Sequence, residues 1–188
     1  MKTPRKFTAP HRLLHWITAG AMFVLFITGF LRMFWMNKHT IVSAIESNTP
    51  ASALSKEQMT SIAKAVRDPM WEWHELFAHI MIFAFIARII YMLVKGIRFP
   101  NPFKTDISLK ERLQGFTYIY FYVFVFISAS TGICIEKEFF TQWSEQIETI
   151  HKLGLYWFPL FVFLHLGGII LAEYSEKKGI ASKMIGGD

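Results

Sequence analysis

Four apolar runs constrain the fold of this chain more than any other feature. They cover approximately residues 13–36, 71–94, 114–135 and 149–173. Each run is long enough to cross the hydrocarbon core of a bilayer as a helix, which takes about 20 apolar residues. A soluble domain rarely contains such runs, even when 53% of its residues are hydrophobic, as here. The sequence therefore predicts an all-α integral membrane four-helix bundle that forms a single domain over residues 1–188.

The charged residues predict how the bundle is oriented. Lys and Arg are concentrated before the first run, between the second and third runs and after the fourth. Because such loops stay on the cytoplasmic side, we expect both termini and the middle loop to be cytoplasmic. Basic residues beside the membrane then explain the net charge of +6. No motif or fold favours a nucleic-acid partner. The first run is too long for a signal peptide and lacks a small-residue cleavage site.

The outer loop, residues 37–70, is the longest segment between the runs. Ser55 and Gln58 have the spacing of a capping box, and apolar residues follow at helical spacing to about Arg67. The sequence therefore predicts a short amphipathic helix in this loop, on the membrane or on a partner. We expect the dipeptide Asp68-Pro69 to end it.

Two histidines in the fourth run, His151 and His165, are fourteen residues apart. Fourteen residues make nearly four helical turns, so both imidazoles point the same way and lie ~21 Å apart along the axis. One spanning helix would then present an imidazole near each membrane surface. Ionisable side chains inside a membrane are costly and mark functional sites.

Histidines in the first two runs match these two depths. His15 lies near the cytoplasmic face, at the level of His165, and His74 lies near the outer face, at the level of His151. Paired histidines are a recognised way to hold the iron of a b-type haem. The sequence has one cysteine, Cys134, and no Cys-x-x-Cys-His motif, so the haem would be bound non-covalently.

Other residues are candidates for contact with the haems. Gly29 lies fourteen residues after His15, where the absence of a side chain lets a macrocycle approach the backbone. Arg88 lies fourteen residues after His74. Its side chain either binds a haem propionate by charge-assisted hydrogen bonds or extends to the cytoplasmic interface of the membrane. Arg12 and Lys152 lie near His15 and His151 in the sequence. They either bind haem propionates or anchor their helices at the membrane interface.

Three further histidines are not expected to be ligands. His79 faces a different direction from His74, because five residues correspond to ~500° of turn. It therefore competes poorly with His74 for the outer haem. Its expected role is a polar contact between helices, and the alternative is a group that supports a ligand or handles protons. His11 and His39 lie outside the runs, and we expect both to face solvent.

These residues resemble those of a known family. The chain is similar to the dihaem b-type cytochrome subunits of nickel–iron hydrogenases and formate dehydrogenases and to the related bacterial cytochromes b561. The resemblance covers nearly the whole chain and rests on Arg12-x-x-His15-Trp16, His74 with Arg88, Thr131-Gly132, the pair His151 and His165, and the tail Lys178–Gly187.

The resemblance implies two haems b, with His15, His74, His151 and His165 as axial ligands of the iron. It also implies the bacterial inner membrane and a site for ubiquinone or menaquinone near the cytoplasmic haem. Gln114, Gly115 and His165 would lie near the quinone, and Glu111 is a candidate for handling its protons. Glu111 and Leu113 differ from the residues of some formate dehydrogenase subunits, and the outer loop is longer than in the smallest cytochromes b561.

The resulting hypothesis is an electron carrier between a quinone pool and an extracytoplasmic redox partner. That partner would be a hydrogenase, a formate dehydrogenase, a reductase or a cytochrome c, and the outer loop is a candidate docking surface. The alternative is a free-standing superoxide:quinone oxidoreductase of the cytochrome b561 type, although the outer side is poor in basic residues. The sequence leaves open whether the chain is a monomer or a homodimer.

Overall fold

The computed structural model describes residues 7–50, 53–174 and 179–187, and every regular element within these ranges is helical. In chain order the elements are α1 (Ala9–Phe30), the π-helical turn η1 (Leu31–Trp35), α2 (Lys38–Asn48), α3 (Lys56–Lys95), α4 (Leu109–Glu136), the 3-10 turn η2 (Thr141–Trp143), α5 (Ser144–Lys152), α6 (Gly154–Glu173) and α7 (Ile180–Ile185). Four stretches of the described chain are long and apolar enough to cross a membrane: Ala9–Trp35, Lys56–Lys95, Leu109–Glu136 and Thr141–Glu173. The predicted helical membrane bundle is therefore confirmed.

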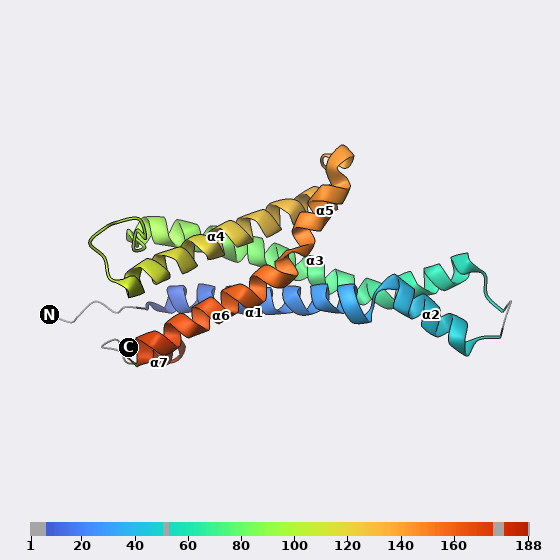
Figure 1. Cartoon of the computed structure of the whole chain (residues 1–188), viewed down its shortest axis with the longest axis horizontal. Coiled ribbons are helices and arrows are strands. Elements are labelled where there is room, and N and C mark those ends of the chain that lie inside the picture. Colours follow the sequence, from blue (N-terminus) through green and yellow to red (C-terminus); the bar gives the residue numbers. More distant parts are fainter. Residues whose placement is uncertain (1–6, 51–52, 175–178, 188) are drawn as a thin grey trace.

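The bundle has two distinct ends (Figure 1). Helices α1 and α3 lie side by side along the long axis, and α4 and α6 pack against each other across them. At the terminal end, α1 begins and α7 ends. At the opposite hairpin end, α2 and the first part of α3 extend beyond the other helices.

The buried core lies midway between these ends. Met22 and Met81 are each seven residues beyond a histidine that we expect to bind haem, His15 and His74 respectively. The buried cluster consists of Ala21, Met22, Met81, Phe121, Phe124 and Val125. Large apolar side chains on the outer faces stay exposed, including Phe83 at 78% and Phe163 at 75%. This outward-facing apolar surface suits contact with lipid.

Helix α3 corrects the prediction for the outer loop. The capping box of Ser55 and Gln58 is present, but the helix that it starts runs for 40 residues through Pro69 to Lys95. At ~1.5 Å per residue it is about 60 Å long, twice the thickness of a hydrocarbon core. Proline removes only one hydrogen bond of the helix, while burial of Met59 and Ala63 stabilises the segment before it. The expected separate helix is thus an extension of the second span.

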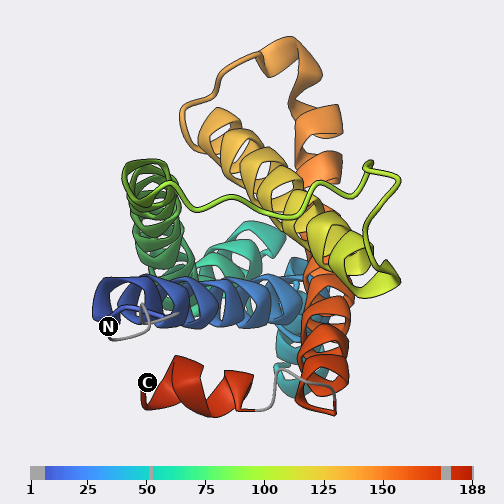
Figure 2. The same cartoon turned by 90° about the vertical axis from the view of Figure 1, so that its left-hand side faces the viewer.

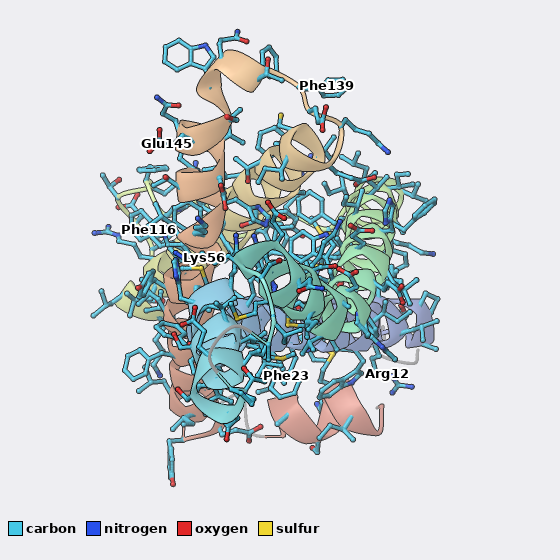
Figure 3. All side chains as sticks on the ribbon, turned by 90° about the vertical axis from the view of Figure 1, so that its right-hand side faces the viewer. Arg12, Phe23, Lys56, Phe116, Phe139 and Glu145 are labelled. Atoms are coloured by element: carbon cyan, nitrogen blue, oxygen red, sulfur yellow. The ribbon has the colours of Figure 1, made fainter. Side chains whose placement is uncertain are left out.

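Helix α2 is a short helix that sequence patterning did not locate. The side chain of Asn37 caps it by accepting a hydrogen bond from the backbone N–H of Thr40. Helix α2 packs against α3, and α2 and residues 56–69 of α3 form the two arms of a protruding hairpin. Figure 3 views the molecule from this end, with Lys56 near the tip.

The fourth span is bent rather than straight. Residues 144–152 and 154–173 form two helices, α5 and α6, that meet at Leu153 and point in different directions (Figure 1). The N–H of Leu153 bonds to the carbonyl of Ile150, a tighter turn than in an α-helix. His151 and His165 therefore lie in one span but on different helices.

The C-terminal helix α7 folds back across the terminal end (Figure 2). The carboxylate of Glu173 accepts hydrogen bonds from the backbone N–H groups of Gly179 and Ala181. The indole N–H of Trp16 donates to the carbonyl of Met184 at 3.2 Å. These contacts attach α7 to both α6 and α1.

Candidate haem sites at the two ends of the bundle

The terminal-end pair consists of His15 on α1 and His165 on α6. Their ring centroids are 6.0 Å apart, with an angle of 42° between the ring planes. His165 stacks on Phe161 at 5.5 Å, and Trp16 meets His15 edge-on at 5.3 Å. Aromatic neighbours therefore set how these two imidazoles are oriented.

The hairpin-end pair consists of His74 on α3 and His151 on α5. Their ring centroids are 6.3 Å apart, and the ring planes meet at 76°. Trp71 stacks on His74 at 5.2 Å with nearly parallel rings. Depth along the helices predicted that His15 would lie near His165 and His74 near His151, and the structure brings these rings together.

Hydrogen bonds determine which nitrogen of each hairpin-end imidazole carries the proton. Nδ1 of His151 lies 3.1 Å from the carbonyl oxygen of Ser128, which can only accept. The hydroxyl of Thr28 lies 2.7 Å from Nδ1 of His74 and 2.8 Å from the carbonyl of Val24. With its single proton donated to that carbonyl, Thr28 would accept a hydrogen bond from Nδ1 of His74. In that arrangement both rings hold their proton on Nδ1 and leave the Nε2 lone pair free to bind a metal.

Gly132 makes room for the ring of His151. A Cβ atom at this position would lie 3.2 Å from Cε1 of His151, closer than side chains usually approach. Thr131, the preceding residue, places its hydroxyl 3.1 Å from Nδ1 of the same ring and donates to the carbonyl of Ile127. The dipeptide Thr131-Gly132 therefore supports this histidine by a hydrogen bond and by close packing.

The geometry of both pairs fits a metal ion between two imidazoles. With metal–nitrogen bonds of about 2 Å, rings on opposite sides of one ion have centres about 6 Å apart. Within the described ranges, no group of three or more metal-binding side chains gathers, so two histidines alone would leave a free ion poorly coordinated. A haem supplies its own equatorial nitrogens and needs only axial ligands. The two-histidine sites therefore suit haem better than a bare ion. At Gly29 nothing lies within 4 Å of where a Cβ would be.

Arg88 lies toward the terminal-end pair. Its positive charge acts on both His15 and His165. Its Nε donates to the hydroxyl of Tyr122 at 3.3 Å, and its guanidinium lies over the ring of Phe121. It is therefore placed among aromatic side chains between helices rather than in open solvent.

The other predicted contact residues have partners of their own. The guanidinium of Arg12 lies against Gly187, next to α7, and Lys152 forms an ion pair with Glu148 at 2.8 Å. Arg12 and Trp16, one turn apart on α1, thus both meet the C-terminal segment while His15 faces His165.

The candidates for a quinone site surround the start of α4. Glu111 completes the capping box of Ser108, and Gln114 donates weakly to the hydroxyl of Tyr118. A Cβ at Gly115 would lie 2.5 Å from the carbonyl oxygen of Pro100, so glycine lets the middle loop lie against α4. Beside it is an open apolar groove of about 430 Å³, lined by Phe99, Pro100, Asn101, Pro102, Phe103, Gly115, Tyr118, Ile119, Tyr122 and Val123.

Two other histidines lie away from these pairs. Nδ1 of His79 donates a hydrogen bond to the backbone carbonyl of Glu75 at 2.8 Å. Its Nε2 lies 4.0 Å from the carboxylate of Glu136 on α4. Its side chain is 58% exposed. His11 is half-buried in α1 against Phe7 and Tyr91, so the prediction that it faces solvent was wrong; α1 begins four residues earlier than expected and includes it.

Comparison with known proteins identifies the family. The family model for prokaryotic cytochrome b561 matches residues 6–187. The chain belongs to this family. Searches of curated proteins and of solved structures found no match. Membership indicates transmembrane electron transfer through haem b.

The sequence of this cytochrome b561 did not reveal two of the residues that support the histidines. Thr28 is an ordinary polar residue in an apolar run, and Ser128 acts through its backbone carbonyl. Thr131 and Gly132 gave a signal only as the Thr-Gly motif of the family resemblance, with no role predicted for either residue. Arg32 lies over the ring of Trp71 at 4.9 Å, and the sequence gave it no predicted role.

Proposed function

We propose that this cytochrome b561 carries electrons between a quinone pool at the terminal end and an extracytoplasmic redox protein at the hairpin end. His15 and His165 would bind one haem b, and His74 and His151 the other. One observation carries the proposal. Two pairs of imidazole rings lie at opposite ends of one bundle, and the ring centroids within the pairs are 6.0 and 6.3 Å apart. When bound, each haem accepts and donates one electron at a time.

The protein's part is to hold and isolate these groups. Thr28, Thr131 and the carbonyl of Ser128 would keep Nε2 of His74 and His151 available as a ligand. The mid-depth core between the pairs would exclude water from the path. The basic loops support a bacterial inner membrane location with the terminal end in the cytoplasm.

The groove beside Gly115 is the candidate site for ubiquinone or menaquinone. Its apolar, aromatic lining suits a quinone ring and tail. Tyr122 lines the groove and accepts a hydrogen bond from Arg88, whose charge in turn acts on His15 and His165. The groove is thus linked to the terminal-end pair through two side chains.

The protruding hairpin is the candidate docking surface for the redox partner. It extends beyond the membrane-spanning part of α3 and exposes Ile62 by 40% and Val66 by 49%, one turn apart on one face. Such a partner would be a hydrogenase, a formate dehydrogenase, a reductase or a cytochrome c. Replacing both residues with glutamate should slow electron transfer with that protein and leave both haems bound, whereas Lys64→Glu, on the same helix, should have little effect.

Counting haem in single variants tests the proposal. The pyridine haemochrome of the purified full chain should give two haems b per chain. Each of His15→Ala, His74→Ala, His151→Ala and His165→Ala should lose one haem, and His79→Ala should keep both. Fewer than two haems in the unaltered chain, or a loss in His79→Ala in place of His74→Ala, would refute the assignment.

One observation favours the alternative of a superoxide:quinone oxidoreductase. Arg32 and Arg67 gather near the hairpin-end pair, and positive charge attracts a small anion. Enzymatically generated superoxide would then reduce the haems without any protein partner. The proposal of a protein partner predicts slow reduction under those conditions.

A further inference from the structure

Arg32 and Trp71 form a stack that continues to the hairpin-end pair. The guanidinium of Arg32 lies 4.9 Å from the centre of the Trp71 ring, and Trp71 is stacked on His74. Arg32 lies one turn beyond Thr28, the hydrogen-bond partner of His74. It belongs to the π-helical turn η1, in which the N–H of Met36 bonds to the carbonyl of Leu31. Such turns re-aim side chains and occur often at functional sites.

Arg67 approaches the same place from α3. It lies seven residues before His74, almost two full turns, and so on the same face of the helix. Its Nε is buried and has no hydrogen-bond partner among the described residues. The charge of Arg67 is close enough to Arg32 to repel it.

The one carboxylate that acts on Arg32 does not balance these two arginines. Glu148 attracts Arg32, but its carboxylate already pairs with Lys152 at 2.8 Å. These four groups, two guanidinium groups, an ammonium group and one carboxylate, together carry an excess of positive charge. Like charges held together at a membrane boundary need an anion.

We propose that Arg32 and Arg67 bind the two propionate carboxylates of the haem at the hairpin end. This inference rests on the proposed binding of haem by His74 and His151. Guanidinium groups match carboxylates through paired hydrogen bonds, and a haem at this pair carries two carboxylates. The phosphate of a lipid headgroup shares this chemistry, and the experiment must separate the two.

The test is a spectroscopic redox titration of the full chain with its haems, in lipid nanodiscs. The hairpin-end haem is identified as the one missing in His151→Ala. Removing a positive charge beside a haem disfavours its reduced form, so Arg32→Gln and Arg67→Gln should each lower the midpoint potential of that haem alone. We expect about a tenfold change in its ratio of reduced to oxidised form at fixed potential, which is 59 mV for one electron.

Two sets of controls complete the design. Arg98→Gln removes an exposed arginine from the middle loop and should shift neither potential. Arg32→Lys and Arg67→Lys keep the positive charge, so the midpoint potential of the hairpin-end haem should stay close to that of the unaltered chain. These variants also provide a test at each position if the glutamine variant fails to fold.

The outcomes distinguish this inference from the proposed function. Two haems with unchanged potentials in both glutamine variants would mean that the arginines bind lipid phosphate or no anion, and would overturn the inference alone. The inference would also be overturned if the midpoint potentials of both haems shifted equally. It would be overturned too if the lysine variants lowered the potential of the hairpin-end haem as much as the glutamine variants do. Absence of a haem that depends on His74 and His151 would instead refute the proposed function.

Discussion

The two histidine pairs of the bundle are supported in different ways. At the hairpin end, both imidazoles have hydrogen bonds at Nδ1, and Gly132 lets His151 lie against α4. At the terminal end, within the described part of the chain, the rings of His15 and His165 have aromatic contacts and no hydrogen bond. Polar groups of neighbouring helices fix one pair, whereas packing orients the other.

This difference indicates which sites should be most sensitive to substitution. A histidine held by hydrogen bonds has a fixed tautomer and a fixed ring direction, so loss of a partner weakens its bond to a metal. A histidine held by packing can turn at smaller cost. The hairpin-end haem should therefore depend on more residues than the terminal-end haem does.

The largest effect should come from filling the space at Gly132. In Gly132→Leu, the new side chain would displace the ring of His151, because even a Cβ comes within 3.2 Å of it. The hairpin-end haem should be lost and the terminal-end haem retained, as measured by haem content and by the number of steps in a redox titration. Gly20→Leu is the matched control, since nothing lies within 4 Å of a Cβ there. Retention of both haems in Gly132→Leu would show that the close packing is irrelevant to haem binding.

Removing a single hydroxyl should have a smaller effect on the same haem. Thr28→Val deletes the one hydrogen-bond partner that His74 has within the described part of the chain, and comparable losses around metal ligands weaken binding 10–100-fold. Thr131→Val should have less effect, because Nδ1 of His151 keeps the carbonyl of Ser128. Haem transfer to a competing apoprotein measures both affinities.

The control for these variants is Thr117→Val. Thr117 bonds to the carbonyl of Leu113 within α4 and contributes to neither histidine pair. Equal haem affinity in Thr28→Val and Thr117→Val would contradict the role assigned to the Thr28 hydroxyl.

Much of the fold could be predicted from the sequence because its signals are local. Apolar length identified the four spans, and helical periodicity matched His15 with His165 and His74 with His151 by depth. These pairs are the ones whose rings lie within 6.3 Å of each other. Their role as haem ligands stays a prediction. Ser55 and Gln58 marked the start of α3 because capping depends only on neighbouring residues.

The features that were missed depend on contacts between distant residues. Pro69 was expected to end a helix, but burial of Met59 and Ala63 stabilises the segment that precedes it. The turn at Leu153 and the π-helical turn that carries Arg32 have no local sequence signature. The partners of the imidazoles lie on other helices, so no periodicity within one run could identify them.

The smallest effect should be seen at the terminal end, in Phe161→Leu. Phe161 lies one turn before His165 and stacks on its ring at an angle of 17°. Leucine retains apolar contact but not the flat surface, so the imidazole can rotate while His165 still faces His15. We expect both haems to remain, with a change in the electron paramagnetic resonance signal of the terminal-end haem, which reports the relative orientation of its axial rings. A signal identical to that of the unaltered chain would show that packing by Phe161 does not orient His165, and the contrast between the two ends would then rest on the hydrogen bonds alone.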